Sequence, residues 1–280
     1  EFDHIGSVED LPQLAEGKSA PGSNERSAAQ EYALVIGLGG TGAECLRSLR
    51  SRAGATHHDG RLSLHSVLID TDRATLDSLR DPELESSAGP CGLVCTPLKT
   101  AKEYRAGGTE HLSTISRRWI YNVPRSATTE GMRPLGRLAL VDHGQVVSKQ
   151  LITAIQQLVR DARGATPRVY VVGSLTGGTS SGMYLDVVHL LRQLLDGAGL
   201  EEASILSMLS TAPMQADPGY PLALYDAHAA LIEMNYFLNA GNGYPGDKGA
   251  GWPSVPAART PLNQVYVIAE PKAGSLSPLP

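Results

Sequence analysis

The chain has little cysteine, few bulky aromatic residues and no long apolar run. Its 280 residues include three cysteines, two tryptophans and two phenylalanines. An odd and low number of cysteines argues against a disulfide framework and favours a reducing compartment. No apolar stretch approaches the ~20 residues that a membrane-spanning helix needs, and the N-terminus lacks the apolar core of a signal peptide. We therefore expect a cytoplasmic protein with no membrane span.

An excess of basic residues is also lacking. The 24 Lys and Arg are outnumbered by 29 Asp and Glu, which gives a formal net charge of -5. Proteins that bind nucleic acid usually present a basic face, so we expect no nucleic-acid partner. The hydrophobic share of 41% is sufficient for the core of one α/β domain of ordinary size, or of two small ones.

The first 30 residues differ in composition from the rest of the chain. They are rich in Ser, Gly, Pro, Glu and Lys, which predicts a flexible tail. Residues 31–280 are expected to form one domain in which short apolar runs alternate with helical patterns. Strands are expected at residues 32–36, 64–69, 93–95, 168–172, 203–209 and 264–269. Helices are expected around residues 45–49 and at 111–120, 136–162, 182–195 and 222–238.

Strands that alternate with helices predict an α/β fold. The expected architecture has three layers, a mostly parallel sheet with helices on both faces. Ligands of such sheets bind beyond the carboxyl ends of the strands. The segments that follow each strand are therefore the places to look for a site.

Two segments rich in glycine connect a strand to a helix. The first, residues 37–42, reads GLGGTG, and the second, residues 176–182, reads TGGTSSG. Glycines let the backbone approach an anion closely, and the N-terminus of a helix offers free N–H donors. The candidate phosphate-binding residues are Gly37, Gly39, Gly40, Thr41 and Gly42, followed by Thr176, Gly177, Gly178, Thr179, Ser180, Ser181 and Gly182. A tight turn without a ligand, a dinucleotide loop or a Ser/Gly linker are the alternatives.

Taken together, these motifs resemble the tubulin/FtsZ superfamily of GTPases, and most closely its bacterial tubulin-like proteins. The family signature reads roughly GGGTG(S/T)G, followed in tubulins by Met, and here TGGTSSGM departs from it at Thr176 and Ser180. The first segment resembles the family loop GxGGxG. Residues 67–76, VLIDTDRATL, resemble the bacterial NTDxxxL motif. That resemblance implies that Asp72 lies near the nucleotide and its metal, and Asp70 is counted in the same site.

Three further segments complete the resemblance. Residues 131–137, GMRPLGR, resemble the loop that senses the terminal phosphate, which implies that Gly131 and Arg133 reach it. By position Asp217 would bind the ribose and Glu270 would read guanine. A turn before Pro218 and a solvated strand end are the alternatives for these two carboxylates.

The resemblance implies GTP or GDP with Mg²⁺ as ligands and head-to-tail self-association into filaments, with other protein partners open. Hydrolysis in the superfamily uses an acidic loop from the neighbouring subunit. The central helix, that loop and the second domain of the superfamily are not seen in these 280 residues. We therefore expect binding with little turnover and name no catalytic residue and no metal-ligating side chain.

Two other functions stay open. GLGGTG followed by an acidic strand end at Asp70 also resembles a Rossmann-type enzyme that binds ATP or NAD, of the adenylating type. The departures in the signature are compatible with a non-hydrolysing, nucleotide-switched scaffold. Cys91 and Cys95 are interpreted as core residues and not as half of a metal site. A Gly178→Glu change is expected to place a side chain in the phosphate site.

Overall fold

The computed structural model describes residues 30–56, 62–211, 220–257 and 260–269. The expected tail therefore lies outside the described residues, except for Gln30. The strands are β1 (Glu31–Leu38), β2 (Leu62–Asp70), β3 (Cys91–Cys95), β4 (Arg168–Ser174), β5 (Ser204–Thr211) and β6 (Gln264–Ala269). The helices on the β1–β3 half are α1 (Gly39–Thr56), α2 (Arg73–Asp77) and α3 (Pro82–Ala88). The later ones are α4 (Ala101–Arg105), the 3₁₀ helix η3 (Glu110–Leu112), α5 (Arg117–Tyr121), α6 (Arg133–Asp142), α7 (Gly144–Ala162), α8 (Gly178–Gly197) and α9 (Tyr220–Phe237).

The six strands form one sheet in the order β3-β2-β1-β4-β5-β6, and every neighbouring pair is parallel. The expectation of a mostly parallel sheet is confirmed. The last six residues of β1 are buried, as expected for the centre of a sheet that is covered on both faces. Because all strands run the same way, their carboxyl ends lie along one edge.

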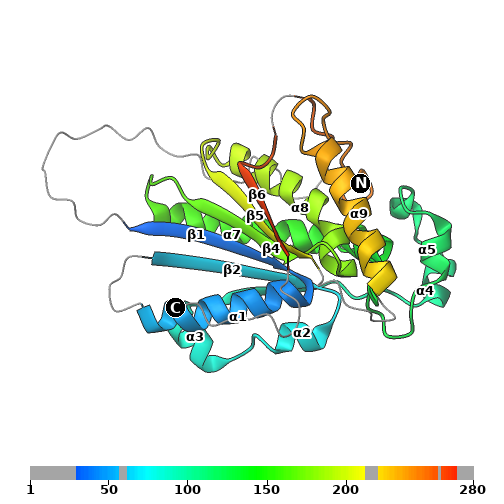
Figure 1. Cartoon of the computed structure of the whole chain (residues 1–280), viewed down its shortest axis with the longest axis horizontal. Helices are drawn as coiled ribbons and strands as arrows, with labels where there is room; N and C mark the ends of the chain where they lie inside the picture. The colour runs from blue at the N-terminus through cyan, green and yellow to red at the C-terminus, as the bar shows by residue number, and fades with distance from the viewer. Residues whose placement is uncertain (1–29, 57–61, 212–219, 258–259, 270–280) are drawn as a thin grey trace, which may run out of the picture.

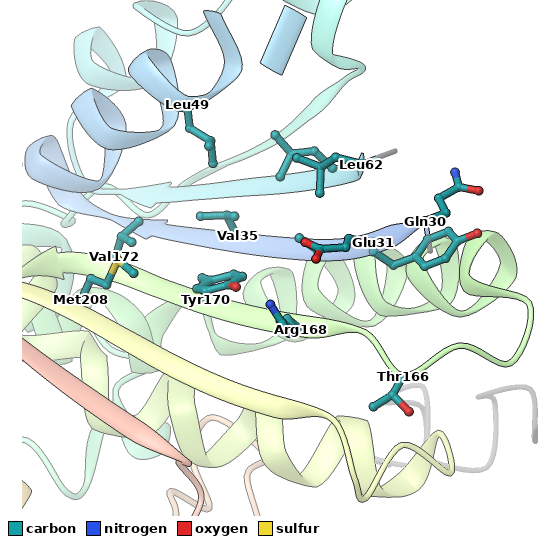
Figure 2. A pocket seen from close by; sticks show the side chains of 13 residues that line it. Gln30, Glu31, Val35, Leu49, Leu62, Thr166, Arg168, Tyr170, Val172 and Met208 are labelled. Atoms are coloured by element: carbon teal, nitrogen blue, oxygen red, sulfur yellow. The ribbon is translucent and has the colours of Figure 1, made fainter. Parts of the chain in front are cut away.

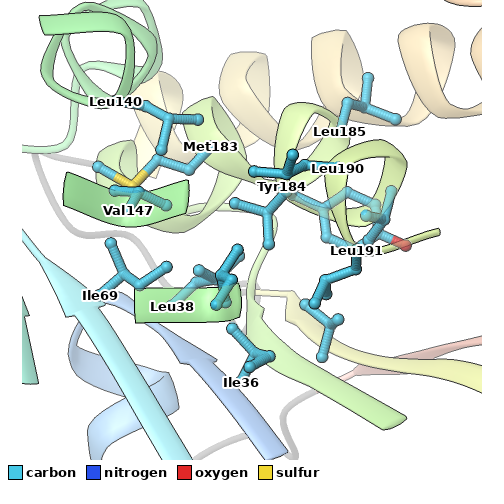
Figure 3. Packing of buried hydrophobic residues seen from close by; sticks show 14 of the residues in the cluster. Ile36, Leu38, Ile69, Leu140, Val147, Met183, Tyr184, Leu185, Leu190 and Leu191 are labelled. Carbon is cyan, nitrogen blue, oxygen red and sulfur yellow. The ribbon is translucent and has the colours of Figure 1, made fainter. Parts of the chain in front are cut away.

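Helices cover both faces of the sheet, so the three-layer prediction is also confirmed (Figure 1). On one face α1 packs on β1, β2 and β4, and on the other α7 and α8 pack on β1, β2, β3 and β4. The core is correspondingly divided into two clusters of buried apolar side chains. Figure 3 shows the larger one, in which Ile36 and Leu38 of β1 and Ile69 of β2 meet Met183 and Leu191 of α8.

The single helix expected at residues 136–162 is wrong, because the structure has two helices there. α6 ends at Asp142 and α7 begins at Gly144, with His143 between them at φ -111° and ψ 17°. A Cβ atom on Gly144 would lie 2.7 Å from the Cβ atom of Ala250. The glycine therefore marks a close approach of another segment, which apolar periodicity alone does not reveal.

Tertiary contacts hold the chain at this junction. The Oδ1 atom of Asp142 lies 2.7 Å from Nζ of Lys99 and 2.9 Å from Nε2 of His111. Nε2 of His143 lies 2.9 Å from the carbonyl oxygen of Pro97. The middle region of the chain thus contacts both Asp142 and His143, the residues at the junction between α6 and α7.

That middle region contains more helix than we expected. The helix expected at residues 111–120 is instead η3 followed by α5, and α2, α3 and α4 were not anticipated. α4 begins with a capping box in which Thr100 and Glu103 exchange hydrogen bonds, a pattern that can be read from the sequence. Short helices of this kind carry too few periodic residues to be found by hydrophobic pattern.

Candidate functional site

The strand order places two connections at one point of the sheet. β1 and β4 are neighbours, and the chain turns outward in opposite directions from them, to β2 on one side and to β5 on the other. In open parallel sheets this reversal leaves a crevice at the carboxyl ends of the two strands, where ligands bind. The segments that follow β1 and β4 are the two glycine-rich motifs.

Both motifs are mostly the first turns of helices. α1 begins at Gly39 and α8 at Gly178, earlier than the helical patterns suggested. The two turns nearly touch, since a Cβ atom on Gly39 would lie 3.4 Å from the Cβ atom of Thr179 and 3.5 Å from the backbone nitrogen of Ser180. Gly39 also has φ +68°, a conformation that a side chain rarely adopts. The structure thus brings the two predicted segments together.

The N-terminus of α8 has no side-chain cap. Its N-cap residue is Gly177, and the first turn of any helix leaves backbone N–H groups without partners inside the helix. The Oγ atom of Ser180 accepts a hydrogen bond of 2.9 Å from the backbone nitrogen of Ser174, and the hydroxyl of Ser181 donates one of 2.8 Å to the carbonyl oxygen of Gly177. Both serine side chains are buried. The groups that this turn can offer to an anion are therefore backbone N–H groups more than serine hydroxyls.

The glycines of the site divide into two kinds. A Cβ atom on Gly40 would meet nothing within 4 Å, and one on Gly177 would meet only the Cβ atom of Ser174 at 3.9 Å. In contrast, a Cβ atom on Gly42 would lie 2.8 Å from the Cα atom of Gly37, and one on Gly173 would lie 2.1 Å from the Oγ atom of Ser180. Gly40 and Gly177 leave room for a ligand, whereas the others allow the chain to pack.

Two glycines of the second motif pack α8 against α6. A Cβ atom on Gly182 would lie 2.2 Å from the carbonyl oxygen of Arg133, and one on Gly178 would lie 2.7 Å from the backbone nitrogen of Met132. A side chain at position 178 therefore points at the backbone before α6. The expectation that Gly178→Glu fills a phosphate site needs correction, because the substitution first breaks this packing.

Thr179, in the first turn of α8, is hydrogen-bonded to the end of β2 and to the loop before α6. Its hydroxyl oxygen lies 3.3 Å from Oδ1 of Asp70, 3.2 Å from Oγ1 of Thr71 and 3.3 Å from Oγ1 of Thr129. Asp70 is buried at the end of β2, and burial raises its pKa although the N–H groups of Thr71 and Asp72 donate to it. The resemblance placed Asp70 and Thr179 in the site, whereas sequence reasoning missed Thr71 and Thr129. The position of Thr71 inside the motif of residues 67–76 was a signal that could have pointed to it.

Asp72 serves as the N-cap of α2. Its Oδ1 atom accepts from the backbone nitrogen of Ala74 at 3.0 Å and its Oδ2 atom accepts from Thr75 at 3.0 Å. Within the described residues, no group of three or more His, Cys, Asp or Glu side chains is arranged to hold a metal ion. A Mg²⁺ ion that depends mainly on phosphates and water is compatible with this arrangement, and its binding stays a prediction.

Arg133 faces α9. Its Nε atom donates to the carbonyl oxygen of Ser181 at 3.0 Å, and its guanidinium forms a two-pronged ion pair with Glu233. To reach a phosphate the side chain must leave this pair. Gly131, with φ +81°, lies beside the first turn of α8, so the backbone of this loop is near the two glycine motifs even though the Arg133 side chain is engaged elsewhere.

The two carboxylates expected to contact ribose and base lie outside the described residues. Glu270 directly follows β6, and Asp217 lies in residues 212–219 after β5. Both segments follow strands whose carboxyl ends lie on the same edge as the glycine motifs. Their contacts with a nucleotide stay predictions.

A cavity lies elsewhere, on the face of the sheet that carries α1 (Figure 2). Its volume is about 510 Å³, and Leu49 of α1, Tyr170 and Val172 of β4 and Met208 of β5 line it. Its walls are mostly apolar, and it extends over the face of the sheet towards the amino ends of the strands, not to their carboxyl ends. It therefore does not belong to the site formed by the glycine motifs.

The sequence profile of the family described as "Tubulin like" matches residues 34–277. No curated protein gave a match. No helix among the described residues is long and apolar enough to cross a bilayer.

Several solved structures are similar in fold. CetZ from Methanosaeta thermophila strain DSM 6194 is 13% identical with a TM-score of 0.51, and the match covers 88% of this chain and 49% of that one. CetZ2 from Haloferax volcanii, in a GTPgS-bound protofilament, is 18% identical with a TM-score of 0.45, covering 72% and 46%. TubZ of Clostridium botulinum phage c-st is 12% identical with a TM-score of 0.42, covering 85% and 51%.

The chain thus spans about half the length of these three solved structures. The family profile, in contrast, covers most of it, from β1 to beyond β6. The sheet order, the two adjoining glycine-rich helix starts and the profile agree with one another. The chain belongs to the tubulin-like family of the tubulin/FtsZ superfamily.

Proposed function

We propose that this chain binds the phosphates of a guanine nucleotide, GTP or GDP with Mg²⁺, between the first turns of α1 and α8. One observation carries the proposal: the two turns adjoin so closely that a Cβ atom added to Gly39 would lie 3.4 Å from the Cβ atom of Thr179 and 3.5 Å from the backbone nitrogen of Ser180, at the point where the strand order reverses. Two helix N-termini that converge there provide two sets of N–H donors and two positive dipole ends for one anion.

The choice of guanine rests on family membership and on Glu270. A carboxylate can accept from the N1–H and N2–H₂ donors of guanine, and adenine has no such pair. Asp217 would accept from the ribose hydroxyls. Thr179, Asp70, Thr71 and Thr129 do not need to touch the nucleotide, since they hold the first turn of α8 in place.

For the protein as a whole we propose the behaviour typical of the superfamily. Copies would assemble head to tail, and an acidic loop from the neighbouring subunit would orient the attacking water. This chain is then a cytoplasmic nucleotide-binding unit with little turnover of its own. A carboxylate that orients water contributes only when it reaches the terminal phosphate.

The test uses Gly177, whose position accepts a Cβ atom without a clash. Gly177→Asp adds a negative charge beside the uncapped N-terminus of α8, so we expect GTP affinity to fall at least 100-fold. Gly177→Asn adds a side chain of the same size and shape without charge, and we expect a loss below tenfold. Affinity is measured by fluorescence titration with a labelled GTP analogue and Mg²⁺, and thermal unfolding verifies that both variants are folded.

Two results would refute the proposal. One is equal GTP affinity of Gly177→Asp and the unchanged protein. The other is a preference of the unchanged protein for ATP or NAD in competition, which would favour the Rossmann-type enzyme.

A further inference from the structure

Helix α9 carries large apolar side chains on its solvent side as well as apolar residues on its packed side. On its inner side Ala227, Ala230 and Met234 are buried where the helix packs beside α8 (Figure 1). Its outer side, centred on His228, presents five large apolar side chains that are between 41% and 69% exposed: Leu224, Tyr225, Leu231, Ile232 and Tyr236. A helix of a soluble domain usually turns polar residues to the solvent. The apolar outer side of α9 is therefore a candidate docking surface.

The charge of this surface favours a second copy of the same chain. Between Tyr220 and Phe237 the only carboxylates are Asp226 and Glu233, and the helix has no Lys or Arg. Asp226 is buried, and Glu233 is paired with Arg133. Two copies of the surface can therefore approach each other without like-charge repulsion, which usually prevents a protein surface from pairing with itself.

The order of the apolar residues points to the same partner. Leu224 and Ile232 lie four residues on either side of His228, and Tyr225 and Leu231 lie three residues on either side of it. In an antiparallel pair of helices related by a two-fold axis at His228, Leu224 meets Ile232 of the other copy and Tyr225 meets its Leu231. Such self-complementarity is what a two-fold interface requires.

We propose that the outer side of α9 is a two-fold interface between two copies of this chain, with the axis at His228. At ~200 Å² for a large side chain, five half-exposed ones present on the order of 500 Å² per copy. Two copies then bury about 1,000 Å², the minimum expected of a specific interface. This contact closes on itself, unlike head-to-tail assembly, and it does not depend on the proposed nucleotide site.

The first experiment measures the mass of the chain by light scattering after size exclusion, over a range of concentrations and without nucleotide. We expect a dimer for the unchanged chain and a dissociation constant at least 100-fold weaker for Ile232→Lys. Val146→Lys is the matched control, because Val146 of α7 is 55% exposed and Ile232 is 56% exposed. The control should remain a dimer, and thermal unfolding should show both variants folded.

The second experiment tests the axis. In a Cys45→Ser background, which removes an exposed thiol, His228→Cys should form a covalent dimer with a short thiol-specific cross-linker. Lys149→Cys, an exposed position on α7, should not. A monomer at every concentration, a dimer that Ile232→Lys leaves intact, or equal cross-linking at positions 149 and 228 would each overturn the proposal.

Discussion

Asp226 is a carboxylate in a place that disfavours its charge. The side chain lies on the buried side of α9, and its Oδ2 atom has no hydrogen-bond partner among the described residues. Burial raises its pKa to about 6, although the Arg133 guanidinium and backbone N–H oppose this. The folded protein therefore binds a proton at Asp226 more tightly than the unfolded chain, in which the pKa of Asp is about 3.9.

This difference makes the stability of the fold depend on pH. The contribution of the protonated carboxyl is fully present below pH ~4 and is lost as the pH rises through the folded value of about 6. A shift of about two pKa units means that the charged Asp226 lowers the free energy of unfolding by ~3 kcal/mol at neutral pH. Replacing it with Asn recovers only part of this, because the buried amide also lacks a hydrogen-bond partner. We predict that Asp226→Asn raises the free energy of unfolding by about 1 kcal/mol at pH 7.5 and reduces its decline between pH 4.5 and 7.5.

Urea titrations at pH 4.5, 6.0 and 7.5 measure this. Asp77→Asn is the control, since Asp77 is half exposed and forms a surface ion pair with Arg80; its effect should be small at every pH. A constant difference between Asp226→Asn and the unchanged protein across the three pH values would show that the charge of Asp226 is not the cause.

Single residues of the site were only partly readable from the sequence. A glycine-rich turn indicates that the backbone lies close to another group, but it does not indicate whether that group is a ligand or another part of the chain. Gly42 and Gly182 approach other backbone, and Gly40 and Gly177 face open space. Distinguishing them requires the positions of segments far away in sequence, and in the case of Gly182 these are the backbone atoms of α6.

At the scale of elements, the junction between α6 and α7 shows a conflict between the helix preference of a residue and a tertiary contact. By intrinsic preference an Ala at position 144 extends a helix better than Gly, by about 1 kcal/mol. The structure predicts the opposite sign, because the added Cβ atom would lie 2.7 Å from the Cβ atom and 3.0 Å from the Cα atom of Ala250. We predict that Gly144→Ala lowers the free energy of unfolding by about 1–3 kcal/mol, the usual effect of overpacking.

The midpoint of urea unfolding measures the change. Gln145→Ala, one residue further on the exposed side of the same turn, is the control and should be neutral or slightly stabilising. A Gly144→Ala protein that is more stable than the unchanged one would mean that the Ala250 segment moves away at little cost.

The long regular elements were predicted well and the short ones were not. All six strands and helices α1, α8 and α9 were expected near their observed places, because each has a sustained apolar pattern, whereas α7 was expected only as part of a single helix over residues 136–162. Helices of five to seven residues, such as α2 and α3, begin at Asp caps and depend on those caps instead of on a pattern. Their existence is encoded by one or two residues each.

For the whole molecule, the fold class followed from the alternation of strands and helices, and the site followed from the family resemblance. The alternation of strands and helices does not predict which face of the sheet each helix covers. α1, α2 and α3 lie on the β1–β3 half of their face (Figure 1). Consequently Met208 of β5 and its neighbour Tyr266 in β6 are 38% and 46% exposed on that face.

β6 combines this exposed apolar row with a strand edge that no other described strand pairs, a combination that promotes aggregation. Tyr266 and Ile268 are both about half exposed. We predict that the double change Tyr266→Lys and Ile268→Lys lowers light scattering at high protein concentration several-fold and changes the unfolding midpoint little. A large loss of stability would instead show that these side chains are held by packing, and unchanged scattering would show that another surface is responsible.

The strand order also determines when each part can form as the chain is synthesised. β3, β2 and β1 lie together and are complete once residue 95 has been made, whereas β4, β5 and β6 come from residues 168–269. The first three strands and α1 can therefore pack together before β4, β5 and β6 have been synthesised. Until β4 pairs with it, β1 is an edge strand of this partial sheet. The crevice between β1 and β4 forms only when β4 pairs with β1, so the proposed phosphate site cannot exist before the second half of the sheet begins to assemble.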